Sequence, residues 1–75
     1  MKVEQLQVDD LVFGFADRPV TVLTRMLRVE KVSVTDRFVT LELRTFGRAR
    51  YKKGQSVPFR EVHRGGEIIF QQEGR

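Results

Sequence analysis

The clearest pattern along the chain is an alternation of apolar and polar side chains within residues 38–46. The alternating positions are Val39, Thr40, Leu41, Glu42, Leu43 and Arg44. A period of two residues is typical of a β-strand that buries one face and exposes the other. Residues 29–34 are rich in β-branched side chains, and the polar residues 35–37 separate them from this strand. The two segments are therefore predicted to form a β-hairpin.

A second hairpin is predicted near the C-terminus, around the dipeptide Gly65-Gly66. Glycine adopts positive φ angles without a steric penalty, which a tight hairpin turn requires. The flanking segments, residues 57–62 and 67–71, are the expected strands. Pro58 has no N–H to donate, so the first of these strands is expected to be an edge strand or to be interrupted there.

The N-terminal part predicts a further strand over residues 11–13, with Gly14 as a bulge or a close backbone approach. Residues 19–29 are compatible with two structures. Asp17 is a suitable N-cap for a helix, but four of the five residues 20–24 are β-branched, which favours a strand.

Short strands separated by Gly and Pro predict an all-β protein, with residues 1–75 forming a single domain. We expect a small five-stranded, partly open barrel, either SH3-like or OB-like. Residues 8–12 resemble the first strand of SH3-like domains, where an acidic turn leads into an apolar strand. The expected interior is drawn from Val12, Val20, Val22, Leu27, Val32, Val34, Val39, Leu41, Leu43, Ile68 and Phe70.

The inventory of reactive side chains argues against an enzyme. The chain has no Cys, and its Ser and His residues are Ser33, Ser56 and His63. No pattern joins a nucleophile to a base and an orienting group, and no phosphate loop or dinucleotide fingerprint is present. His63 is expected to be a polar turn residue, and Asp9 and Asp10 a solvated turn. We therefore predict a non-enzymatic protein with no cofactor and no metal.

No segment approaches the roughly 18 apolar residues that a membrane-spanning helix needs. Residues 1–5 lack the apolar region of a secretory signal. The absence of Cys is compatible with a reducing compartment. These features lead us to expect a cytoplasmic protein that does not contact a membrane.

The charge of the chain is unevenly distributed. The net charge is +4 overall, −3 over residues 1–17 and +7 over residues 18–75. Residues 43–60 contain no acidic residue and six basic ones: Arg44, Arg48, Arg50, Lys52, Lys53 and Arg60. If residues 48–52 are extended, Arg48, Arg50 and Lys52 project to one side, and Tyr51 projects to the other.

This basic segment suggests a nucleic-acid-binding accessory protein. The six basic residues would contact phosphates, and Phe46 and Tyr51 would stack on unpaired bases. Sequence specificity should be weak, because no recognition helix is evident. The alternative explanation is a solvated loop that only increases solubility.

A protein-interaction module is an equally open hypothesis, such as an adaptor, an inhibitor or an assembly subunit, including a phage or bacterial accessory protein. Such a module would use an exposed strand edge, and the basic segment would then meet an acidic partner. Homodimerisation belongs to the same hypothesis. The candidate contact residues are Phe13, Phe15, Met26, Phe38 and Phe46.

Overall fold

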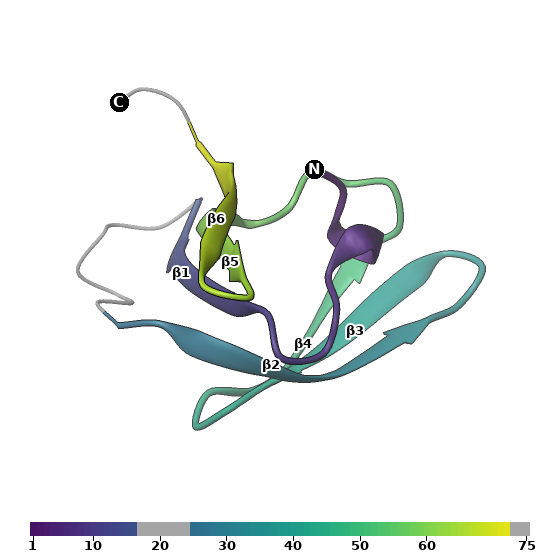
Figure 1. The fold of residues 1–75 in the computed structure, drawn as a ribbon. Helices are drawn as coiled ribbons and strands as arrows, with labels where there is room; N and C mark the ends of the chain where they lie inside the picture. The colour runs from purple at the N-terminus through teal and green to yellow at the C-terminus, as the bar shows by residue number, and fades with distance from the viewer. Residues whose placement is uncertain (17–24, 73–75) are drawn as a thin grey trace.

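The computed structural model describes residues 1–16 and 25–72, which form a single antiparallel sheet of six strands. After the 3-10 helix η1 (Val3–Gln5), the strands are β1 (Leu11–Phe15), β2 (Leu27–Val34), β3 (Phe38–Leu43), β4 (Gly47–Lys52), β5 (Phe59–Arg64) and β6 (Glu67–Gln71). Their order in the sheet is β4-β3-β2-β1-β5-β6. Figure 1 shows that the sheet is strongly bent, and that the N-terminal segment with η1 lies inside the bend.

The all-β prediction is confirmed, but the five-stranded barrel is not. The sheet has six strands, and within the described residues no ladder joins the edge strands β4 and β6, so the sheet is open. The strand predicted over residues 38–46 ends at Leu43, because Thr45 takes a φ of 65° and turns the chain into β4. The disputed residues 19–24 lie outside the described residues, whereas residues 27–29 begin β2.

Both predicted hairpins are present. β2 and β3 pair around residues 35–37, and the Thr35 N–H donates to the Phe38 carbonyl at 2.9 Å. β5 and β6 pair around Gly65 and Gly66, whose φ angles of 61° and 84° explain the need for glycine. β5 begins directly after Pro58, as expected for an interrupted strand, but it lies between β1 and β6 and is not an edge.

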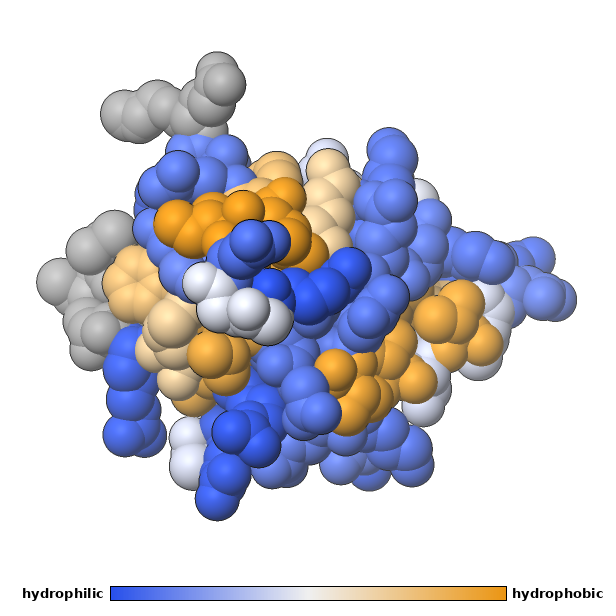
Figure 2. All heavy atoms as spheres, in the orientation of Figure 1, coloured by the Kyte–Doolittle hydropathy of each residue, from blue (hydrophilic) through white to orange (hydrophobic). Residues whose placement is uncertain are grey.

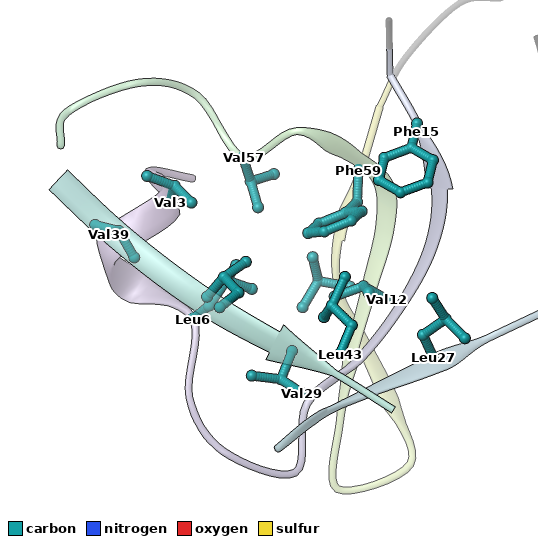
Figure 3. Close-up of a cluster of buried hydrophobic side chains, with 12 residues drawn as sticks. Val3, Leu6, Val12, Phe15, Leu27, Val29, Val39, Leu43, Val57 and Phe59 are labelled. Carbon is teal, nitrogen blue, oxygen red and sulfur yellow. The ribbon is translucent and has the colours of Figure 1, made fainter. Parts of the chain in front are cut away.

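The core fills the inside of the bent sheet, where side chains from both halves of the sheet meet those of the N-terminal segment (Figure 3). The buried apolar residues are Val3, Leu6, Val12, Phe15, Leu27, Val29, Val39, Leu41, Leu43, Val57, Phe59 and Val62. Val3 and Leu6 come from the N-terminal segment, and a hydrogen bond from the Val3 N–H to the Gln55 carbonyl holds this segment in place. The N-terminus thus closes a core that the strands alone leave open.

Five predicted core residues, Val12, Leu27, Val39, Leu41 and Leu43, are buried, and Val32 and Phe70 are partly buried against them. Two predictions are wrong: Val34 is 47% exposed and Ile68 is 52% exposed. Val34 pairs with the buried Val39 but lies at the last position of β2, where the core ends. Ile68 pairs with His63 next to a bulge, which places it outside. Val20 and Val22 lie outside the described residues.

Candidate functional site

The outer surface of β2, β3 and β4 carries a regular pattern of charged side chains. In antiparallel strands, residues directly opposite each other point to the same face. The register pairs Arg48 with Glu42, Arg50 with Thr40, and Lys52 with Phe38, whereas the inward-facing Leu41 is buried. We call this surface the basic face; its residues are Lys31, Ser33, Phe38, Thr40, Glu42, Arg48, Arg50 and Lys52.

The spacing of the cations follows from strand geometry. Arg48, Arg50 and Lys52 occupy alternate positions of β4, so their Cα atoms are about 7 Å apart. The intervening Ala49 and Tyr51 turn inward and are partly buried. Because β4 is an edge strand, the cationic row runs along the border of the sheet. The prediction that Arg48, Arg50 and Lys52 project to one side of the strand, and Tyr51 to the other, is confirmed.

Two carboxylates lie near the four cations: Glu42 on the basic face, and Glu30, which lines one hollow with Glu42 and Arg48. Arg48 Nη2 lies 3.6 Å from Glu42 Oε2, with the two side chains 72% and 39% exposed. An ion pair this exposed is weak, so Arg48 keeps much of its capacity to meet another anion. Arg50 is placed differently, because its Cζ lies 4.5 Å from the centroid of the Phe38 ring. A cation over an aromatic ring is held by the electron density of the ring face.

A hollow of about 470 Å³ adjoins the Phe38 end of the basic face. Its lining residues are Glu4, Asp36, Arg37, Phe38, Lys52, Lys53 and Gly54. Glu4 Oε1 accepts the Gly54 N–H at 2.9 Å, and this hydrogen bond is the main reason why the pKa of Glu4 lies below its usual value. Lys53 also lines this hollow and lies beside the basic face, just beyond the end of β4.

The two predicted stacking residues differ in position: Tyr51 lies on the inner side of the sheet, whereas Phe46 lines a hollow of about 650 Å³ with Glu42 and Arg48 at one end of the basic face. Tyr51 points inward and packs edge-on against the buried Phe59, with ring centroids 6.5 Å apart. Phe46 is 45% exposed in the turn between β3 and β4, and its ring centroid is 5.2 Å from that of Phe15. Phe38 is the aromatic residue that the register places among the cations.

Two of the predicted phosphate contacts also lie elsewhere. Arg60 belongs to β5, and its stem packs on Gly14, where an added Cβ would lie 2.9 Å from Arg60 Cδ. Arg44 lies with Arg25 and Arg28 around a separate hollow of about 280 Å³. This three-arginine cluster was not predicted, because it depends on the register in which the start of β2 pairs with the end of β3.

The apolar residues predicted for a protein interface do not form one surface. Phe15 is 4% exposed and belongs to the core, so it is excluded as a surface contact. Phe13 and Phe38 are half-buried, and the more exposed Met26 and Phe46 lie in loops.

Two adjacent exposed apolar residues, Ile68 and Ile69, lie on β6, at 52% and 40% exposure. Figure 2 shows this strongly hydrophobic surface over β6. Sequence reasoning missed it, because it assigned Ile68 to the core.

The acidic turn before β1 is also different from the prediction. Asp10 is 1% exposed, and its carboxylate accepts hydrogen bonds from Arg64 Nε and Nη2 at 2.8 and 2.9 Å and from the Gln7 N–H at 2.8 Å. Burial alone would raise the pKa of Asp10, but these hydrogen bonds outweigh it and hold the pKa below the usual value. Of the two carboxylates in this turn, Asp9, with a φ of 77°, is the exposed one.

His63 lies within β5 and not in the turn, with Nε2 2.9 Å from Glu61 Oε1. Within residues 1–16 and 25–72, no group of three or more His, Asp or Glu side chains is arranged to hold a metal ion. The same part of the chain contains no helix of the length and apolar character needed to cross a membrane.

No known protein family matches this chain, and neither does any curated protein or solved structure. The interpretation of the basic face therefore depends on its own geometry and charge.

Proposed function

We propose that this chain is a non-enzymatic, cytoplasmic nucleic-acid-binding protein that contacts the phosphate backbone with its basic face. The observation that carries the proposal is the row of Arg48, Arg50 and Lys52 on the outer side of one edge strand. Cations at regular spacing on a single surface suit a polyanion whose charges also repeat regularly. Lys53 and Arg37 add positive charge in the adjoining hollow, where Glu4 and Asp36 offset part of it.

We also infer that the bent sheet is a partly open barrel of the SH3-like kind, with β6 as an additional strand. Small barrels frequently bind oligonucleotides on an exposed sheet face with flanking loops. In this interpretation the core and the N-terminal segment fix the curvature of the sheet, and the outer side of β2–β4 remains available for a ligand.

Binding to fluorescein-labelled oligonucleotides, measured by anisotropy as a function of salt, tests the proposal. Each neutralised phosphate contributes a log–log slope of about −0.9 on duplex and about −0.7 on single strands. Two to three contacts predict that a fourfold rise in salt weakens binding by about 10- to 40-fold on duplex. The absence of binding to both duplex and single strands at low salt would overturn the proposal.

A second candidate function, protein–protein interaction, is favoured by the exposed Ile68 and Ile69 on the edge strand β6. The register of β5 and β6 shifts between Val62 and His63, which leaves Ile69 as an extra residue in a bulge. Bulges hinder the addition of a further strand, so the apolar side chains are the better contact here. Homodimerisation through Ile68 and Ile69 is one version of this hypothesis, and it can be tested with the purified protein alone.

A further inference from the structure

We propose that the ligand of the basic face is a single-stranded nucleic acid, and that the Arg50 guanidinium, supported by Phe38, is the platform on which an unpaired base stacks. This inference rests on the proposed function and specifies its ligand. Among the described residues, the register places one aromatic side chain on the basic face, and this ring lies under Arg50 at 4.5 Å.

The position of Arg50 fits stacking better than it fits a phosphate contact alone. Single-stranded nucleic acids are recognised by stacking their bases on aromatic rings or on the planes of arginine guanidinium groups. Phe38 is half-buried and fixes one side of the guanidinium, while Arg50 itself is exposed. The side of the guanidinium away from the ring is therefore open to a base. Because the ring restricts the side chain before binding, less conformational entropy is lost on stacking.

The surroundings of this pair provide places for the rest of a nucleotide. Lys52 lies directly opposite Phe38, and the 470 Å³ hollow beside it is also lined by the cations Lys53 and Arg37 and by the carboxylates Glu4 and Asp36. A base on Arg50 would place its phosphates toward these cations. In a duplex, neighbouring base pairs cover the faces of each base, so this stacking mode requires an unpaired strand.

Tyr51 and Phe46 are less suitable for this role. Tyr51 packs against Phe59 on the inner side of the sheet, and Phe46 contacts Phe15 beyond the end of β3. Neither residue shares the outward-facing register of Arg48, Arg50 and Lys52.

The test compares three labelled probes of equal phosphate number: oligo(dT), an abasic oligonucleotide of the same length, and a duplex. One stacked base corresponds to roughly 5- to 150-fold in affinity, so wild-type protein should bind oligo(dT) at least about fivefold more tightly than the abasic probe. Arg50→Lys keeps the charge and removes the planar group, so this preference should be lost. Arg48→Lys is the matched control on the same strand and face, where Glu42 and no ring lies opposite, and it should retain the preference.

Equal binding of oligo(dT) and the abasic probe by wild-type protein would overturn the inference and leave the proposed function standing. A preference that survives in Arg50→Lys would exclude Arg50 as the platform. Binding to none of the probes at low salt would overturn both proposals. Circular dichroism and thermal melting of each variant would show that a loss of preference does not reflect unfolding.

Discussion

Strand β4, at one edge of the sheet, exposes Arg48, Arg50 and Lys52, whereas strand β6, at the other edge, exposes Ile68 and Ile69. Both edges face the same difficulty, because unpaired strands invite edge-to-edge association. At β4 the repulsion between cations opposes pairing with a second copy and favours an anionic partner. At β6 the bulge at Ile69 opposes the pairing of a further strand with this edge.

The two halves of the sheet also differ in regularity. In the half formed by β2, β3 and β4, the strands β3 and β4 pair without a shift over six residue pairs, so their inner and outer faces alternate, and the pairing of β2 with β3 shifts once, between Val29 and Lys31. The half formed by β1, β5 and β6 contains the positive φ of Gly14, the bulge at Ile69 and the pair of the buried Asp10 with the partly exposed Arg64. The regular pairing of β3 with β4 therefore presents the basic face. In the half formed by β1, β5 and β6, the long-range contact between Arg64 and Asp10 contributes to stability.

The largest effect is expected from a cavity in the regular half. Leu41 is fully buried, so Leu41→Ala should reduce the free energy of unfolding by about 2–5 kcal/mol. That loss is comparable with the whole stability of a small domain. Urea unfolding followed by circular dichroism measures it. Thr40→Ala, at the neighbouring outward-facing position, is the control and should change stability by less than about 0.5 kcal/mol. Similar losses in both variants would contradict the assignment of the two faces.

In the irregular half, Arg64→Ala should cost about 1–3 kcal/mol at pH 7, because the buried Asp10 carboxylate loses its charged partner, whose own side chain is partly exposed to solvent. The wild-type pKa of Asp10 lies below its ordinary value of 3.8. The stabilisation from its ionised form is therefore present at neutral pH and is lost as the pH falls through 3.8 toward the lower folded value.

The stability difference between wild type and Arg64→Ala should accordingly shrink as the pH is lowered from neutral to about 3. Urea unfolding at several pH values tests this dependence. Arg64→Lys, which keeps the charge but cannot form both hydrogen bonds, should be intermediate. A difference that is independent of pH would show that the pair does not act through the charge of Asp10.

The unequal regularity of the halves explains how far the sequence could predict the structure. Alternation at residues 38–43 gave the strand, the buried face and, together with residues 48–52, the cationic row. The role of Asp10 could not be predicted, because its partner Arg64 lies 54 residues away and a buried carboxylate has the same local sequence as a solvated turn. Ile68 was misassigned because a single-residue bulge reverses the face of the residues beyond it.

A smaller effect is expected at the apolar edge. Ile68 is 52% exposed, so Ile68→Lys should change the free energy of unfolding by less than about 0.5 kcal/mol. If this patch mediates homodimerisation, the sedimentation coefficient of the wild type should rise with protein concentration, and the variant should remain monomeric. Gln71→Lys adds the same charge to β6 without removing an apolar side chain and is the control. A wild-type protein that stays monomeric at every concentration would contradict dimerisation through β6.

The most direct test of the account asks whether the position of the cations matters or only their number. Gln replaces Arg48, Arg50 and Lys52 in one variant, and the exposed Lys2, Arg25 and Arg28 in the other, so both lose three charges. The salt dependence of oligo(dT) binding is then measured for both. The first variant should lose about 2 from the magnitude of the log–log slope, since each single-strand contact contributes about 0.7. The second should keep a slope close to that of the wild type. Equal changes in the two variants would contradict the claim that the basic face is the binding site.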